Sequence, residues 1–294
     1  IIIEGWENHP EGRKLELVAY DSMSIKPGSI IDNQILKNDI NAIYASGFFS
    51  GVKIKSEDGP LGVRLIVSVV PNPILNKVEL NPKKTIISNK YVNDIFSNNY
   101  GKTLNLNDLQ KGIKSIEKWY EEKGYSLARI NDPERISGNG IVSLTVDEGV
   151  ISRIRKRFLG ADGEVLVDAE GNERRGKTKD FVIDRELKTV GGSIFNRKIL
   201  QEDIKRLYKT SLFDDVKVSI GRDIKNPSQV EIILDLSEIR TGSLTGGIGF
   251  SNSSGIFATA GVQESNALGR AWSTNTSVNF GEYSTTFSFS LTDP

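Results

Sequence analysis

Three stretches of the chain repeat one pattern, in which an apolar stripe at helical spacing leads through a turn into a short strand. The stripes are Leu36, Ile40, Ile43 and Tyr44; Leu109, Ile113, Ile116 and Tyr120; and Leu200, Ile204, Leu207 and Tyr208. The turns and strands that follow are Gly47-Phe48-Phe49 with Val52-Lys53-Ile54, Gly124-Tyr125 with Leu127-Ala128-Arg129-Ile130, and Ser211-Leu212-Phe213 with Val216-Lys217-Val218. Apolar residues three or four positions apart share one face of a helix. The repetition predicts tandem modules and not one catalytic core.

Each repeat extends into a unit with the expected order strand, helix, helix, strand, strand. The units cover residues 1–73, 74–149 and 150–240, so the first 240 residues have an α+β fold class. In the first unit, a turn at 57–60 and an apolar run at 63–70 follow the repeat strand and predict a hairpin.

Short polar side chains precede the repeated helices. Asp32, Asn105 and Asn196 occupy matching positions. A side-chain oxygen there accepts a hydrogen bond from the first free N–H groups of a helix. We therefore predict that these three residues are N-caps.

The third unit differs from the other two by an insertion at residues 161–179. The insertion is rich in Gly, Asp, Glu and Arg, so it can bury little apolar surface. We expect it to form a surface loop or hairpin.

The composition changes near residue 241. Residues 1–240 hold 72 charged side chains, whereas residues 241–294 hold four: Glu264, Arg270, Glu282 and Asp293. Apolar and small residues alternate with polar ones along this tail, as in the series Trp272, Thr274, Thr276, Val278 and Phe280, and in the series Phe287, Phe289 and Leu291. About four strands with one apolar face are typical of a transmembrane β-barrel. The edge of a soluble sandwich is the other interpretation.

Four strands cannot close a barrel, and open edges are not tolerated in lipid. If the tail is part of a barrel, we expect the remaining strands to lie beyond Pro294. The chain opens at Ile1 without a methionine, so we also expect a longer protein. It has no run of 18 apolar residues that could form a membrane helix.

The residue inventory argues against several kinds of catalysis. Cysteine is absent, which excludes disulfides, thiolate metal sites and cysteine nucleophiles. The single histidine, His9, lies in a polar stretch without a second histidine. Lys+Arg and Asp+Glu are both 38, so the charge balance does not point to nucleic acid. We expect no enzyme activity, no metal and no cofactor.

Basic residues gather in one run at the start of the third unit. Arg153, Arg155, Lys156 and Arg157 lie close to the apolar tail in sequence order. A solvated strand face is the ordinary interpretation of such a run. Contact with anionic lipid headgroups is the sharper alternative.

The strand after each aromatic turn is a candidate binding edge. An outer strand of a small sheet exposes unpaired N–H and C=O groups, and lysines on it discourage permanent aggregation. Such an edge can accept an extended segment of another chain by β-augmentation. We expect Val52, Lys53, Ile54 and Lys55, together with Val216, Lys217 and Val218, to bind a client segment in this way. An edge that is merely protected and idle is the alternative.

Together these motifs resemble a known family. The module order and the signature Ile-Tyr-x-x-Gly-Phe-Phe-x-x-Val-x-Ile resemble POTRA domains, the polypeptide-transport-associated modules. Three such modules before Gly-Gly-Ile-Gly-Phe-Ser and barrel-type strands are similar to the BamA-type outer-membrane-protein insertase superfamily. The segments Asn-Pro-Ile-Leu-Asn-Lys-Val-Glu and Gly-Asn-Glu-Arg-Arg-Gly-Lys-Thr are similar to its cyanobacterial and chloroplast branch. The middle copy departs from the signature at Tyr125-Ser126.

The resemblance implies a function, partners and a location. POTRA modules in the periplasm, or at a chloroplast outer envelope, would receive unfolded outer-membrane proteins and pass them to a barrel in residues 241–294 and beyond. Outer-membrane lipid and accessory assembly proteins are the other implied partners, and neither ATP nor metal is implied. The insertion at 161–179 would lie near the barrel mouth. A two-partner-secretion or chloroplast-envelope translocation pore is the alternative, although three modules count against the former. A scaffold that only recruits lipoproteins or spaces the barrel is a further class.

Overall fold

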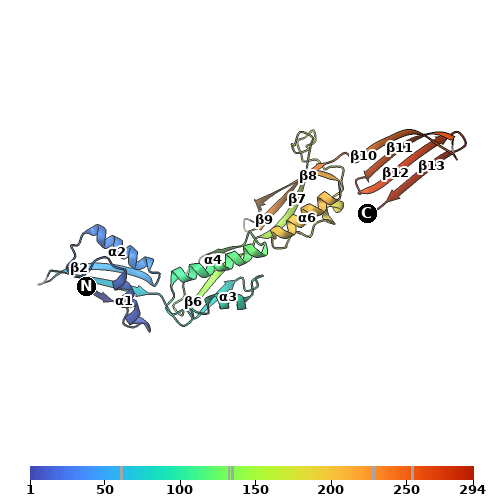
Figure 1. Cartoon of the computed structure of the whole chain (residues 1–294). Helices are drawn as coiled ribbons and strands as arrows, with labels where there is room; N and C mark the ends of the chain where they lie inside the picture. The colour runs from blue at the N-terminus through green and yellow to red at the C-terminus, as the bar shows by residue number, and fades with distance from the viewer. Residues whose placement is uncertain (60–61, 132, 134–135, 227–228, 253–254) are drawn as a thin grey trace. The chain divides into compact units, whose positions relative to one another are not determined.

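The computed structural model describes residues 1–59, 62–131, 133, 136–226, 229–252 and 255–294. Within these residues the strands form three sheets of three strands and one sheet of four (Figure 1). Contacts group the chain into two compact units. The first contains residues 1–123 and 128–148, and the second contains residues 124–127 and 149–294.

The first unit contains two successive α+β layers. Their elements are β1 (Ile2–Glu4), α1 (Gly12–Ser22), α2 (Asn33–Ala45), β2 (Phe49–Gly59) and β3 (Gly62–Pro71), followed by β4 (Lys77–Asn81), α3 (Asn89–Phe96), α4 (Leu106–Lys123), β5 (Arg129–Asn131) and β6 (Ile141–Asp147). In each sheet the last strand is central, parallel to the first strand and antiparallel to the second. Both layers have the element order that the repeat predicts.

The second unit contains a third layer of the same order and then a meander. Its elements are β7 (Val150–Leu159), α5 (Asp180–Asp184), α6 (Arg197–Lys209), β8 (Phe213–Arg222) and β9 (Gln229–Glu238), followed by β10 (Gly242–Ser251), β11 (Gly255–Ala267), β12 (Trp272–Gly281) and β13 (Thr285–Thr292). The order β7-β9-β8 repeats that of the first unit, whereas β10 to β13 are antiparallel neighbours in sequence order. No helix in the described part of the chain is long and apolar enough to cross a membrane.

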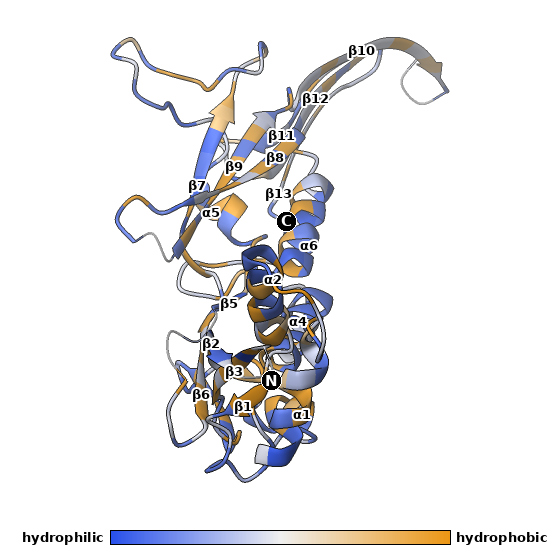
Figure 2. Ribbon diagram, turned by 90° about the vertical axis from the view of Figure 1, so that its left-hand side faces the viewer, coloured by the Kyte–Doolittle hydropathy of each residue, from blue (hydrophilic) through white to orange (hydrophobic). Residues whose placement is uncertain are grey.

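Helices pack their apolar faces against one face of each three-stranded sheet. In the first layer Leu15, Ile43, Phe49 and Val67 are buried in one cluster that α1, α2 and the sheet share. Figure 2 shows hydrophobic and hydrophilic residues on the same helices, as this amphipathic packing requires.

The hairpin between β2 and β3 is longer than the sequence predicts. The predicted turn at 57–60 is wrong for residues 57–59, because β2 continues to Gly59. Glu57 pairs with Arg64 across the hairpin, and opposite charges on facing strands favour pairing over a wider turn. Pro60 lies outside the described residues.

The insertion at 161–179 is an exposed loop with two short bridges, as its composition predicts. Leu159 bridges to Val165, and Val167 bridges to Glu173. Residues 161–164 and 167–175 are exposed, but the loop ends at the buried side chain of Thr178. The end of the insertion is therefore anchored, which its composition does not predict.

The predicted N-caps are confirmed. Asp32 accepts hydrogen bonds from the N–H groups of Gln34 and Ile35, and Asn196 accepts them from Lys198 and Ile199. Asn105 accepts the N–H of Asn107 at 2.8 Å.

Asn105 has a second role that Asp32 cannot have. Its Nδ2 donates to the carbonyl oxygen of Ser46 at 2.9 Å, at the end of the helix in the preceding layer. A carboxylate has no N–H donor, so an asparagine suits a cap that joins two layers. Gly47 allows this close approach, since a Cβ there would lie 2.6 Å from Asn105 Oδ1.

Glu11 also connects the two layers of the first unit. Its Oε2 accepts the N–H of Thr103 at 2.7 Å and the hydroxyl of Thr103 at 2.6 Å. The hydroxyl bond, followed by the amide bond, lowers the pKa of the Glu11 carboxyl from 4.5 to about 2. The ionised form therefore favours the folded contact.

We expect this contact to depend on pH only in acid. A carboxyl with a lowered folded-state pKa contributes its full stabilisation above pH 4.5, and the contribution falls as the pH decreases toward 2. Amide exchange of Thr103 between pH 2 and 7 measures the contact. Glu11→Gln should remove most of the pH dependence, whereas Glu16→Gln on the same helix should preserve it. An unchanged pH profile in Glu11→Gln would show that another group links the layers.

Candidate functional site

The candidate binding residues of the first and third layers lie on outer strands. Residues 52–55 belong to β2 and residues 216–218 belong to β8, and each strand pairs on one side only among the described strands. Val52 and Val216 are buried against the helices, whereas Lys53, Lys55 and Lys217 are exposed on the opposite face. The structure therefore brings these residues to two separate sheet edges.

A tyrosine hydroxyl occupies the first outward amide of each edge. The N–H of Val52 donates to Tyr44 Oη at 3.0 Å, and the N–H of Val216 donates to Tyr208 Oη at 3.0 Å. Tyr208 Oη also donates to Asp215 Oδ1 at 3.1 Å. Gly51 stands at the position equivalent to Asp215, so the first layer offers no side-chain acceptor there.

The alternation of antiparallel pairing decides which other groups face outward. Val52 is opposite Val69, whose carbonyl oxygen lies beside Gly5 on the β1 side of the sheet. Main-chain groups of alternate residues point to opposite sides of an antiparallel strand. The N–H and C=O groups of Ile54 and Ser56 therefore face outward with those of Val52.

The same rule applies to β8 and divides the expected residues into two groups. Val218 and Ile220 present outward N–H and C=O groups, in step with Val216. Lys53, Lys55 and Lys217 direct these groups toward the central strands, so they can offer only side chains to a client. Because directions alternate along a strand, each residue with outward main-chain groups is followed by one whose main-chain groups face the central strand.

The middle layer also has an outer strand, β5, but its described edge is shorter. The described part of β5 is the short segment Arg129–Asn131. Its tyrosine, Tyr120, is buried and donates to Glu148 at 2.5 Å. Burial and this bond raise the pKa of Tyr120.

A repeated spacing marks the two tyrosines in the sequence, although it does not reveal their hydrogen bonds to the edge amides. Tyr44 precedes Val52, and Tyr208 precedes Val216, by the same number of residues, within the signature quoted above. The middle copy has an additional residue between its tyrosine and its glycine.

The four-stranded sheet has one apolar face and one polar face. Strand register aligns the apolar side chains in rows across the sheet. One row holds Leu244, Val262, Thr276 and Phe289. The next row holds Ala260, Val278 and Phe287, and the row after it holds Ile248, Ala258 and Phe280. Leu244, Ile248 and Phe287 are 83%, 89% and 65% exposed. The opposite face carries rows such as Gln263, Asn275 and Ser290, and Thr245, Ser277 and Ser288. An apolar face of this extent marks a surface that something covers.

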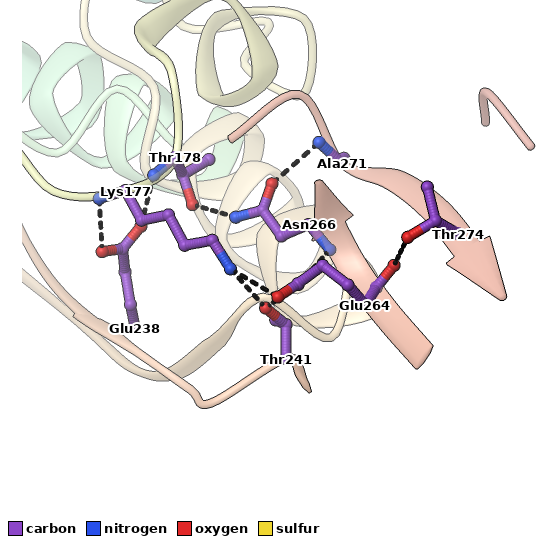
Figure 3. A network of polar contacts seen from close by, with 8 residues as sticks. All are labelled: Lys177, Thr178, Glu238, Thr241, Glu264, Asn266, Ala271 and Thr274. Carbon is purple, nitrogen blue, oxygen red and sulfur yellow. Dashed lines mark hydrogen bonds and ion pairs between the residues drawn. The ribbon is translucent and has the colours of Figure 1, made fainter. Parts of the chain in front are cut away.

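A polar network joins the end of the insertion to this sheet (Figure 3). Lys177 Nζ contacts Glu264 Oε2 at 2.8 Å and Thr241 Oγ1 at 3.1 Å. Glu238 accepts the N–H groups of Lys177 and Thr178 at 2.8 and 2.6 Å. Glu264 also accepts from the Thr241 hydroxyl. The network therefore connects the loop, the end of β9 and the strand β11.

The turn between β11 and β12 completes the connection. Asn266 Nδ2 donates to Thr178 Oγ1 at 2.9 Å, and its Oδ1 accepts the N–H of Ala271 at 2.8 Å (Figure 3). The N–H of Lys179 donates to the carbonyl oxygen of Gly269 at 2.9 Å. Asn266 is buried, so its bonds hold the turn against the loop. The sequence gives no local signal for the bond between Asn266 and Thr178, because they are 88 positions apart.

The basic run on β7 is already paired. Arg153 Nε lies 2.7 Å from Glu231 Oε1, Arg157 Nε lies 2.6 Å from Asp235 Oδ1, and Lys156 Nζ lies 2.5 Å from Asp184 Oδ1. Arg155 contacts Glu173 at 3.4 Å. Contact with lipid headgroups stays a prediction, and it would have to compete with these carboxylates.

His9 makes a local contact. Its Nδ1 accepts the N–H of Glu11 at 3.2 Å. In the part of the chain that the structure describes, no group of three His, Cys, Asp or Glu residues could hold a metal ion.

Known families match both units of the chain. Residues 74–149 match the family described as "POTRA domain, ShlB-type", and residues 167–238 match "Surface antigen variable number repeat", whose model is named POTRA. A solved structure, "POTRA1-3 of the periplasmic domain of Omp85 from Anabaena", is 38% identical with a TM-score of 0.69, and the match covers 81% of this chain and 93% of that one. The chain belongs to the Omp85 family.

Two longer proteins are also similar to this chain. The chain is 27% identical to "Outer envelope protein 80, chloroplastic" from Oryza sativa subsp. japonica, over 100% of the chain and 44% of the relative. It is 25% identical to "Outer membrane protein assembly factor BamA" from Nitratidesulfovibrio vulgaris, over 90% of the chain and 34% of the relative. The chain thus spans less than half the length of these relatives. These relatives are an outer-membrane protein and a chloroplast outer envelope protein, and in the Anabaena structure the matched POTRA modules are periplasmic.

Proposed function

We propose that this Omp85 chain is the client-receiving part of an outer-membrane protein assembly factor. Its POTRA modules bind unfolded β-barrel proteins along sheet edges and deliver them to a barrel that begins at β10. The observation that carries the proposal is the pair of outer strands, β2 and β8, with outward main-chain groups at Ile54 and Val218. The name of the BamA relative supports the same role.

The four-stranded sheet supplies the membrane part of the proposal. Its strands contain between 8 and 13 residues, and its apolar face suits lipid while its polar face suits a barrel interior. Further strands outside these residues would complete the barrel, because lipid does not tolerate open edges. We propose residues 1–73, 74–149 and 150–240 as the three modules and residues 241–294 as the first barrel strands.

The partners follow from this role. Unfolded outer-membrane proteins are the clients, outer-membrane lipid covers the apolar face, and accessory assembly proteins are further partners. Strand pairing and the burial of apolar client surface drive insertion, so no catalytic step, metal or cofactor is needed.

Proline substitution on β8 tests the function. Val218→Pro removes an outward N–H without removing a bond to β9, so the module should fold while client capture weakens. One lost main-chain bond contributes about 0.5–1.5 kcal/mol, which corresponds to roughly 2- to 12-fold weaker capture. The measurement is the yield of folded outer-membrane proteins in cells that carry only the variant.

The control is Lys217→Ala, which keeps the main chain of the same strand. Normal assembly in Val218→Pro and in the additional variant Ile220→Pro would contradict edge binding and favour a spacer role. A translocation pore of the chloroplast-envelope type is the second candidate, and the match to a chloroplast outer envelope protein supports only that location. If the protein is such a pore, the Val218→Pro variant should lose transport of a soluble substrate while barrel proteins still assemble.

A further inference from the structure

The main-chain edges of β2 and β8 do not begin where the strands begin. β2 starts at Phe49 and β8 starts at Phe213, but the first outward amides, those of Val52 and Val216, already donate to tyrosine hydroxyls. Donors available to another chain therefore begin at Ile54 and Val218. This difference has a direct consequence for how a client strand aligns.

We propose that Tyr44 and Tyr208 set the register of the client strand by blocking the first rung of each edge. The inference depends on the proposed edge binding and specifies its alignment. An incoming extended segment pairs with Ile54 and Ser56 on β2, and with Val218 and Ile220 on β8. The occupant is a segment of an unfolded outer-membrane strand, because its alternating apolar and polar residues match the two faces of these edges.

The contacts explain why a hydroxyl serves as the block. The hydroxyl accepts a hydrogen bond from the amide of Val52 or Val216 without adding a neighbouring strand. The amide at the strand end is therefore paired, and a client strand cannot shift onto it. Without such a fixed end, a strand can pair in registers that differ by two residues and still present the same faces. A terminal cap selects one of these registers.

The two caps differ in strength. Tyr208 Oη both accepts from Val216 and donates to Asp215, whereas the first layer has Gly51 at the position of that carboxylate. Two bonds fix the orientation of the Tyr208 hydroxyl. The β8 edge is therefore the one with the more strictly defined register.

Disulfide mapping measures this register directly. The 294 residues hold no cysteine, so a single Lys217→Cys or Ser219→Cys substitution introduces a unique thiol within them. Both side chains are exposed, and both would form non-hydrogen-bonded pairs with a client strand added in the antiparallel direction, where Cα atoms are close enough for a disulfide. The probe is a peptide with the sequence of residues 285–292 that carries Ser288→Cys or Ser290→Cys.

The full-length membrane-embedded protein should form the disulfide at Ser219→Cys and little at Lys217→Cys. Tyr208→Phe should shift pairing by two residues toward Val216 and raise the Lys217→Cys yield by about 2- to 12-fold. It should also accelerate exchange of the Val216 amide by a similar factor. Asp215→Ala, which weakens the cap without changing the ring, should produce a smaller shift in the same direction.

The matched control is Tyr91→Phe. Tyr91 is 40% exposed, close to the 41% of Tyr208, and it lies on α3 of the middle layer, which contains neither β2 nor β8. It should leave the register unchanged. If Tyr208→Phe forms the disulfide at the same position as the unaltered background, Tyr208 does not set the register, although edge binding still holds. No disulfide at any position in the unaltered background would overturn edge binding and the register together.

Discussion

Replacing Asp203 with alanine is expected to lower the free energy of unfolding of the third layer by about 3–5 kcal/mol. Asp203 is 0% exposed and accepts the N–H groups of Lys188 and Thr189 at 3.0 and 2.8 Å. It also contacts Arg206. Alanine leaves two amides without their acceptor in a place that water does not reach readily, and it removes the carboxylate partner of Arg206. Unsatisfied buried groups cost far more than an average hydrogen bond contributes.

Amide exchange of β9 in the full-length protein measures this loss. β9 is the central strand of the layer, so its amides exchange mainly through opening of the whole sheet. Asp214→Ala is the control, because Asp214 is exposed on β8 and surface changes usually remain within about 0.5 kcal/mol. Equal effects of the two variants would show that Asp203 does not hold the layer together.

Asp39 makes the same kind of buried contact in the first layer. It is 1% exposed and accepts the N–H groups of Ser24 and Ile25 at 2.7 and 3.0 Å, as Asp203 does in the third layer. In the middle layer Gly112 stands at this place in the helix and packs against Phe96, where a Cβ would lie 2.2 Å from the ring. The middle layer therefore replaces a polar anchor with an aromatic contact.

Replacing Gly269 with alanine is expected to separate the loop that ends at Lys179 from the turn between β11 and β12. Gly269 has a φ of +73°, which costs about 1–2 kcal/mol for a residue with a Cβ. A Cβ there would also lie 2.0 Å from the carbonyl oxygen of Lys177, so the backbone must move. The bond from Lys179 N–H to Gly269 should break, and the contacts of Asn266 and Glu264 should weaken with it.

Exchange of the Lys179 amide reports this separation. Gly247→Ala is the matched control, because Gly247 lies on β10 with open space around an added Cβ. It should change neither the Lys179 amide nor the network in Figure 3. Full protection of the Lys179 amide in Gly269→Ala would show that the loop is held by Lys177 and Thr178 alone.

Local patterns determined much of the fold. The stripes that contain Ile43 and Leu207 predict the helices α2 and α6, and the caps at Asp32 and Asn196 follow from side-chain chemistry within three residues of sequence. The alternation in residues 241–294 predicts the two faces of the four-stranded sheet. These signals are strong because helix periodicity, capping and strand alternation depend on neighbouring residues.

Contacts between distant residues required the tertiary structure. The register of β8 against β9 decides that Val218, and not Lys217, directs its main-chain N–H and C=O groups outward. The alternation of residue types along the strand does not show which residues do so. Glu264 and Lys177 meet although they are 87 positions apart in the sequence. Asn105 shows both levels at once, because its position predicts a cap, whereas its bond to Ser46 depends on how the second layer packs on the first.

The sequence by itself determined the tandem α+β layers, the capped helices and the amphipathic strands, since each depends on periodicity within a short segment. The tertiary structure alone decided which amides face outward, that Tyr44 and Tyr208 occupy the first of them, and how Glu264 and Asn266 join the insertion to the sheet. Those features depend on strand register and on side chains that approach from distant segments, and neither is encoded in local spacing.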